Sequence, residues 1–179
     1  VVLKINSPDI QHKTEVKGVV INLTDEQEVR QAYRTIMENV KTYRPDARIE
    51  GVIVSEFCRP AAEMILGAHK DPMFGPVIVV GLGGIFVEHL KDVARCIPPV
   101  GHSEAEKMVE GLRAHSLLKG ARGRAEADVR ALTEAIVKFS DFVVANRDWI
   151  QSAEINPLMV LEEGNGVRMA DALIISETN

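Results

Sequence analysis

Two apolar segments close to the C-terminus, Leu158–Leu161 and Val167–Ile175, constrain the fold of this chain more than any other feature. Between them lies Glu162-Glu163-Gly164-Asn165-Gly166, and Asn and Gly accept the positive φ angles of tight turns. The pattern predicts a closing β-hairpin, which Asn156 enters and Asp171 leaves. Two oxygen ligands held close together suit Mg²⁺ on a nucleotide, whose phosphates and waters supply the remaining positions. The hairpin therefore indicates phosphoryl chemistry.

The composition is that of a globular protein with a substantial core. The chain has 179 residues, of which 46% are hydrophobic and 26% charged. We expect residues 1–179 to form one nucleotide-binding domain, either undivided or built from two small lobes. Because Val1–Ile5 reads as a strand already under way, we also expect the N-terminal part of the fold to be missing from this sequence.

The charge and the cysteines exclude several classes of protein. A net charge of −5 argues against a nucleic-acid surface, which normally carries a basic stripe. Cys58 and Cys96 cannot build a disulfide framework, and no Cys/His cluster has the spacing of a zinc site. No apolar run reaches the roughly 18 residues of a transmembrane helix, and no signal peptide is visible. We therefore expect a cytoplasmic protein that binds neither nucleic acid nor membrane.

The hydrophobic periodicity predicts helices that flank strands without a regular βαβ alternation. The predicted helices are Asp25–Tyr43, which begins after a Thr24/Gln27 capping box, Ser103–Leu112 and Ala125–Asn146. The predicted strands before the hairpin are Val1–Ile5, Val19–Leu23, Ile49–Phe57, Glu63–His69, Val77–Gly81, Phe86–Leu90 and Val93–Ile97. The fold class is therefore α+β, with mostly antiparallel sheets flanked by helices.

Two basic side chains near the N-terminus each allow two interpretations. Lys4 shares a strand face with Val2, and it is either solvated or reaches into a site to neutralise a phosphate. His12 lies in the polar loop Asn6–Gly18. A loop histidine is either an ordinary surface residue or, when a carboxylate orients it, a nucleophile that accepts a phosphoryl group.

Glycines and acids at strand ends form the second group of candidates. In Gly81-Leu82-Gly83-Gly84 the glycines either let backbone N–H groups approach phosphate oxygens or form a plain turn. Glu56 and Glu63 lie at strand ends. Their carboxylates either bind ribose hydroxyls or a metal, or they are ordinary solvated acids. Glu154 and Asn156 alternate around Ile155, so they share one face of a strand.

The order of these motifs closely resembles one family, the ATP-grasp domain of the ADP-forming acyl-CoA synthetases, which are relatives of succinyl-CoA synthetase β subunits. The resemblance covers essentially the whole chain. It rests on Val2-Leu3-Lys4, the loop from Ser7 to Val19, Asp71-Pro72-Met73-Phe74-Gly75-Pro76, Gly81-Leu82-Gly83-Gly84-Ile85-Phe86-Val87-Glu88, Leu90-Lys91-Asp92-Val93 and Glu154-Ile155-Asn156-Pro157-Leu158.

The resemblance implies a reversible reaction in which an acid, CoA and ATP give acyl-CoA, ADP and phosphate. It further implies a CoA-binding α subunit, or fused CoA-binding domains, as the partner. His12 matches a histidine that relays the phosphoryl group, and Glu154 resembles the carboxylate that steadies the phosphohistidine. Lys4 looks like the lysine on the nucleotide phosphates. Val54 and Glu56 resemble the hinge that meets adenine and ribose, Glu63 resembles an acid near the ribose or metal, and Asn156 and Asp171 look like the Mg²⁺ ligands.

Two positions depart from the family pattern. Lys17-Gly18 stands where the family often has two glycines, and the lysine should stiffen the loop. The family usually carries an arginine where Cys96 falls, whereas this chain has Arg95 one position earlier. Because adjacent strand residues face opposite ways, a phosphate contact from Arg95 would require a bulge.

Two other functions fit a chain of this kind. One is a regulatory or vestigial domain of a fused lysine acetyltransferase, which the presence of Lys4, His12, Asn156 and Asp171 disfavours. The other is an ATP-grasp ligase that makes an amide. Such an enzyme needs no phosphohistidine, so the His12 loop argues against it.

Overall fold

The computed structural model describes residues 1–10, 12–83, 92–113, 115–120 and 125–177. The chain divides into two compact units, Val1–Cys58 and Arg59–Asn179, and each is described by itself. The predicted strand Phe86–Leu90 lies outside the described residues. Among the described residues, every helix is too short or too polar to span a lipid bilayer.

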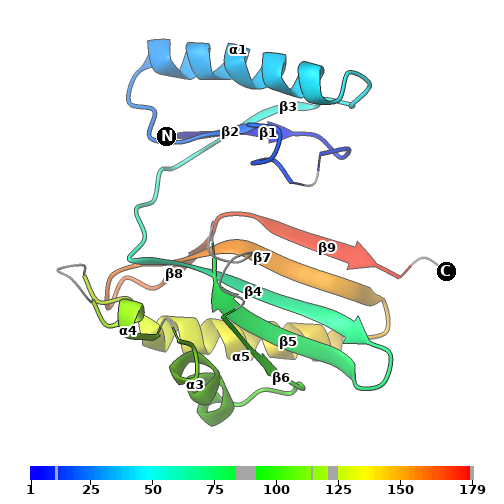
Figure 1. Ribbon diagram of the computed structural model, residues 1–179, viewed down its shortest axis with the longest axis vertical. Coiled ribbons are helices and arrows are strands. Elements are labelled where there is room, and N and C mark those ends of the chain that lie inside the picture. Colours follow the sequence, from blue (N-terminus) through cyan, green and yellow to red (C-terminus); the bar gives the residue numbers. More distant parts are fainter. Residues whose placement is uncertain (11, 84–91, 114, 121–124, 178–179) are drawn as a thin grey trace. The chain divides into compact units, whose positions relative to one another are not determined.

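Unit 1 is a small antiparallel sheet with one helix packed on one face (Figure 1). Its strands are β1 (Val2–Asn6), β2 (Val19–Val20) and β3 (Gly51–Ser55), in the order β2-β1-β3. The helix is α1 (Glu26–Tyr43). Leu3 and Ile5 alternate along β1 and are buried in one cluster with Ile36 and Val40 of α1.

Helix α1 begins one residue later than the capping pattern predicted. Asp25, not Thr24, is the N-cap, and its carboxylate accepts a hydrogen bond from the Glu28 N–H. The Glu28 side chain reaches back to the Thr24 N–H and hydroxyl. The reciprocal arrangement is therefore present, but its members are Asp25 and Glu28 rather than Thr24 and Gln27.

Unit 2 contains a six-stranded antiparallel sheet in the order β6-β5-β4-β7-β8, with β9 also paired to β7. The regular alternation along β4 and β7 is interrupted by one shift of register between Met64 and Leu66. The strands are β4 (Ala62–Asp71), β5 (Gly75–Leu82), β6 (Val93–Cys96), β7 (Ile150–Val160), β8 (Val167–Met169) and β9 (Ala172–Ser176).

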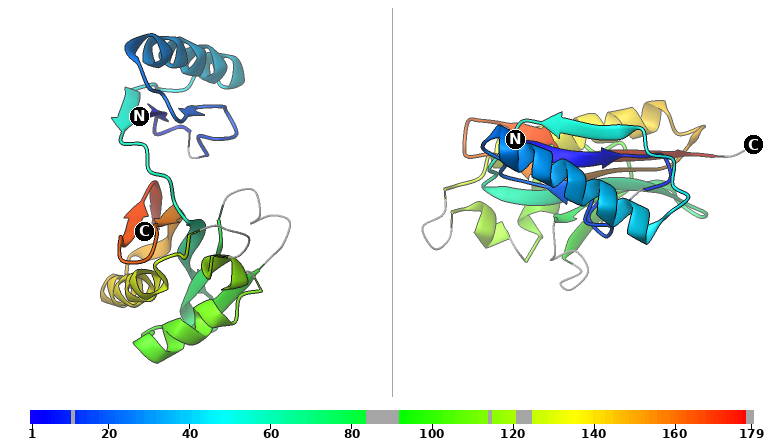
Figure 2. Two further views of the ribbon diagram at one scale, coloured as in Figure 1. Left: turned by 90° about the vertical axis from the view of Figure 1, so that its left-hand side faces the viewer. Right: turned by 90° about the horizontal axis from the view of Figure 1, so that it is seen from above.

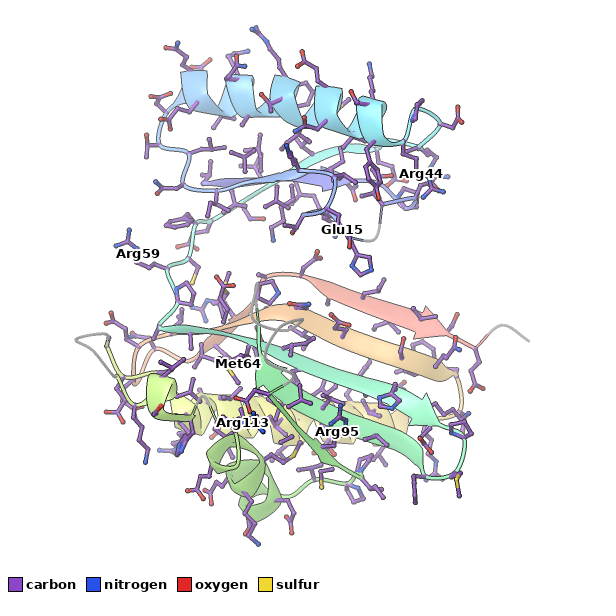
Figure 3. All side chains as sticks on the ribbon, in the orientation of Figure 1. Glu15, Arg44, Arg59, Met64, Arg95 and Arg113 are labelled. Atoms are coloured by element: carbon purple, nitrogen blue, oxygen red, sulfur yellow. The ribbon has the colours of Figure 1, made fainter. Side chains whose placement is uncertain are left out.

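The helices α3 (His102–Glu110) and α5 (Val129–Ala145) cover one face of this sheet, and the short α4 (His115–Leu118) lies beside them (Figures 1 and 2). The core of unit 2 lies between these helices and the sheet. Met64, labelled in Figure 3, is fully buried there. We call the opposite face of the sheet the outer face.

Asp128 joins the start of α5 to the turn between β7 and β8. One carboxylate oxygen accepts the Ala131 N–H at 2.9 Å, as an N-cap does, and the other accepts the Gly166 N–H at 2.9 Å. The residue is 6% exposed. A single buried carboxylate therefore supports two elements that are distant in the sequence.

The α+β class and the antiparallel sheets are confirmed, with several local corrections. Strand β7 begins at Ile150, well before the predicted hairpin arm, and the second arm is divided into β8 and β9. In the turn, Gly164 and Gly166 have positive φ angles of 80° and 81°, whereas Asn165 does not. The last predicted helix starts at Val129 rather than Ala125.

Candidate functional site

Unit 2 brings three of the predicted site residues together, where β7 meets β9. The Asn156 Nδ2 group donates to the Glu154 carboxylate at 2.9 Å, so both side chains lie on one face, as the alternation predicted. Ile155 packs into the core on the opposite face. The backbone N–H of Asn156 donates to the Asp171 carbonyl oxygen at 3.1 Å. The predicted convergence of Asn156 and Asp171 is thus present in the backbone pairing.

The hydrogen bond from Asn156 to Glu154 also orients the amide of Asn156. A carboxylate only accepts hydrogen bonds, so it takes the NH₂ end of the amide and leaves the Oδ1 atom for another partner. Asp171 accepts the Ala172 N–H with one carboxylate oxygen. Within the described part of the chain, no three His, Cys, Asp or Glu side chains gather as metal ligands. A hard cation here would therefore need oxygens from a bound ligand, as Mg²⁺ on a nucleotide does.

A row of directly paired residues crosses the outer face of the sheet. Strand pairing joins Arg95 of β6 to Val79, Val79 to Gly67, Gly67 to Glu154 and Glu154 to Leu173. Directly opposed residues in an antiparallel sheet share a face. Arg95, labelled in Figure 3, is therefore exposed on the same face as Glu154.

This geometry corrects the expectation for Arg95 and Cys96. Cys96 pairs with Ile78 and packs against the helix-side core, whereas Arg95 is on the outer face without any bulge in β6. An arginine one position later would point into the core. The alternation argument gave the relative orientation of the two residues correctly, but not which of them faces outward.

The glycine segment serves the packing of the sheet in the part that the structure describes. The Gly83 N–H donates to the Glu63 carbonyl oxygen at 2.8 Å, so the sheet already uses this donor. A Cβ atom at Gly83 would lie 3.0 Å from the Met64 carbonyl oxygen. The Glu63 side chain is exposed in β4. Gly84 lies outside the described residues.

In unit 1, Lys4 lies on the face of β1 that points away from α1. It pairs with Val19 on one side and Ile53 on the other, and it is half-buried. Val54 is 59% exposed in β3, and Glu56 is exposed just beyond the end of that strand. Unit 1 thus presents all three to solvent or to a ligand.

The His12 loop borders a cavity of about 440 Å³. Hydrogen bonds hold both stems of the loop. At one stem Asp9 accepts from the Arg44 side chain and from the Arg48 N–H, and at the other the Lys17 carbonyl oxygen accepts from the Asn39 side chain. The cavity is lined by Pro8, Asp9, Ile10, His12, Glu15, Val16, Tyr43 and Arg44.

Lys17 adopts a φ angle of 50°, in the left-handed region that glycine occupies most easily. The family pattern of two glycines fits this backbone, and the lysine here adopts it nonetheless. Nothing in the sequence indicated that Arg44 lines this cavity together with His12, because the two residues are far apart in the chain and no local pattern relates them.

The family model described as an ATP-grasp domain matches residues 1–175. The beta subunit of acetate–CoA ligase [ADP-forming] II from Pyrococcus furiosus is 41% identical over 175 residues, which make up 98% of this chain and 74% of that subunit.

Two solved structures of acetyl-coenzyme A synthetase 1 from Ca. Korarchaeum cryptofilum have the same fold. One, in complex with coenzyme A, Ca-AMPCP and HgCl⁺, has a TM-score of 0.91 and 41% identity over 98% of this chain and 76% of that one. The other, with coenzyme A and Mg-AMPPCP, has its phosphohistidine segment pointing towards the nucleotide-binding site. It has a TM-score of 0.80 and 37% identity over 99% of this chain and 76% of that one. The expected fold is therefore confirmed.

Proposed function

Since this chain belongs to the ATP-grasp family, we propose that it is the nucleotide-binding, phosphoryl-transferring part of an ADP-forming acyl-CoA synthetase. The reaction converts an acid, CoA and ATP reversibly into acyl-CoA, ADP and phosphate. The observation that carries the proposal is the group of oxygen-bearing side chains at Glu154, Asn156 and Asp171, held together by β7 and β9. The relatives reported above are acid–CoA ligases, which favours this function over an acetyltransferase domain.

In this proposal Asn156 and Asp171 hold Mg²⁺ through oxygen atoms. The donor set fits this ion, because Mg²⁺ prefers a few protein oxygens and completes its shell with phosphate and water. When bound, Mg²⁺ supplies charge neutralisation and orientation of the phosphate oxygens. Lys4 is the proposed phosphate-neutralising lysine of unit 1, and Arg95 on the outer face of unit 2 is a further candidate cation. Val54, Glu56 and Glu63 are the proposed contacts of the adenosine, and Gly83 is proposed to lie near the phosphates.

His12 is the proposed phosphoryl acceptor. The lone pair of its neutral imidazole attacks the terminal phosphorus of ATP, an N–P bond forms, and the P–O bond to ADP breaks with its electron pair leaving on ADP. Glu154 is assigned to the same step, as the carboxylate that steadies the phosphohistidine. The reverse step returns the phosphoryl group to ADP, so the domain exchanges phosphate in both directions.

The partner in this proposal is a CoA-binding subunit or a fused CoA-binding domain, because the relatives include the beta subunit of an acetate–CoA ligase [ADP-forming]. A cytoplasmic location belongs to the same proposal, and the free thiols of Cys58 and Cys96 are in keeping with it.

Calorimetric titration of ATP with and without Mg²⁺ tests the site. We expect Mg²⁺-dependent binding that weakens at least about tenfold in Asp171→Ala, since a ligand to the metal is lost. Asp148→Ala is the matched control, because it also removes an aspartate. This side chain is 97% exposed, and its ion pair is a long one of 3.9 Å with the adjacent residue Arg147. Equal affinities in the two variants would refute the assignment of Asp171.

Labelling with [γ-³²P]ATP tests the relay. We expect an acid-labile label on the parent protein and none on His12→Ala. A label that persists in His12→Ala would assign the acceptor to another residue.

A further inference from the structure

The cavity beside His12 contains a single cationic side chain that the proposed reaction does not use. Of the eight residues that line it, all within the described chain, Arg44 is the one lysine or arginine. Lys17 lines a second cavity, which shares Glu15, Val16 and Tyr43 with the first. Glu15 and Arg44 are both labelled in Figure 3, at the end of unit 1 where α1 finishes. Arg44 is thus the cation that shares a cavity with the proposed phosphoryl acceptor.

The position of Arg44 is fixed by its contacts. Its backbone N–H caps α1 by donating to the Val40 carbonyl oxygen. Its Nη1 atom donates to the Asp9 carbonyl oxygen, and the Asp9 carboxylate accepts the Arg48 N–H at 2.7 Å. The guanidinium is therefore tied to the stem of the His12 loop by one of its five N–H donors, and the remaining donors are available for an anion.

The charge in the cavity changes when His12 carries a phosphoryl group. Phosphorylation adds close to two negative charges, and two acidic residues, Asp9 and Glu15, already line the same cavity. The phosphoryl group and the two carboxylates carry the same sign of charge and repel one another. The phosphorylated loop therefore needs a compensating cation. A guanidinium meets this need better than an ammonium, because its planar fork binds two phosphoryl oxygens at once.

We propose that Arg44 binds the phosphoryl group carried by His12, so that the cavity of unit 1 is a holding site for the phosphohistidine between its two transfers. The ligand is an N-phosphoryl imidazole dianion of the same chain. This inference rests on the proposed function and adds to it a binding residue that stabilises the phosphorylated state. Arg44 takes no part in breaking or forming the N–P bond.

The test measures the equilibrium between ATP plus unmodified protein and ADP plus phosphorylated protein. The full-length protein is incubated with Mg²⁺ and set ratios of ATP to ADP, and the acid-labile label is counted. Because Arg44 is exposed and water screens its ion pairing, we expect the equilibrium constant to fall by only about two- to fivefold in Arg44→Ala. Arg34→Ala, which removes an equally exposed arginine of α1 outside the cavity lining, should leave the constant unchanged.

Two further measurements separate anion binding from a structural role. Arg44→Lys keeps the charge and should restore part of the loss, and free guanidinium ion should raise the phosphorylated fraction of Arg44→Ala without affecting the parent. An unchanged constant in Arg44→Ala, or a loss that neither lysine nor guanidinium repairs, would overturn the proposal while leaving the relay intact. Absence of label from the parent protein would instead refute the relay, and the holding site with it.

Discussion

Gly18 shows how strongly one atom constrains the end of the His12 loop. A Cβ at this position would lie 2.6 Å from Ile5 Cγ2 and 3.0 Å from the Lys13 carbonyl oxygen, and Ile5 is fully buried. We expect Gly18→Ala to lower the free energy of unfolding by about 1–3 kcal/mol, because the core around Ile5 must shift. Urea unfolding measures the effect.

Gly67→Ala is the control for this change, since its Cβ would meet only the Ala153 carbonyl oxygen, at 3.5 Å. The control should lose clearly less stability than Gly18→Ala. Equal losses in the two variants would show that the contact with Ile5 is not the cause.

Single residues also show how far the sequence determines the site. The shared face of Glu154 and Asn156 followed from strand alternation alone, and the hydrogen bond between them confirms it. The orientation of Arg95 could not be predicted, because alternation relates neighbours and does not say which face a helix will cover. The cavity contact between the His12 loop and Arg44 joins segments about thirty residues apart, and no local pattern encodes it.

At the scale of secondary structure, Asp128 links α5 to the β7–β8 turn, and its replacement should lower the stability of unit 2. Its Oδ2 accepts the Gly166 N–H while Oδ1 caps the helix. Asp128→Asn replaces one acceptor with a donor, so one of these N–H groups loses its partner. We expect the free energy of unfolding at pH 7 to fall by about 1–3 kcal/mol. Asp141→Asn, an exposed position on the same helix, should change it little.

The same carboxylate predicts a pH dependence. The Ala131 N–H, followed by those of Gly166 and Gly164, holds the pKa of Asp128 below its ordinary value of 3.8, although burial opposes this shift. Because the folded pKa is the lower one, the contribution is complete above the unfolded pKa and is lost as the pH falls through the folded pKa. The stability difference between the parent and Asp128→Asn should therefore shrink below about pH 4. A difference that stays constant down to acidic pH in urea titrations would contradict this account.

The elements were largely predictable where their periodicity is regular. Helices α1, α3 and α5 and most strands were expected within a few residues of their observed bounds. The start of β7 was missed because Gln151, Ser152 and Glu154 are polar, and only Ala153 among these four residues is a buried apolar side chain. The division between β8 and β9 was missed for a similar reason, since the apolar run continues through a break in the pairing.

At the scale of the whole molecule, the two units have separate hydrophobic clusters. Ile36 belongs to the cluster of unit 1 and Ile136 to that of unit 2, and both are fully buried. We expect Ile36→Ala and Ile136→Ala each to destabilise their own unit by about 2–5 kcal/mol. Hydrogen exchange followed by mass spectrometry should show faster exchange confined to the unit that carries the change. Equal loss of protection in both units from either variant would show a single cooperative structure.

The row of paired residues across the outer face of unit 2 carries two opposite charges, those of Arg95 and Glu154. Arg95 and Glu154 are separated by three strand intervals, which is roughly 14 Å. In water their attraction at this range is only about 0.3 kcal/mol, and salt weakens it further, so neither charge cancels the other. Along this row the outer face therefore carries a positive charge on β6 and a negative charge on β7, and the pair favours one orientation of a molecule with an anionic tail and a chelated cation over the reverse.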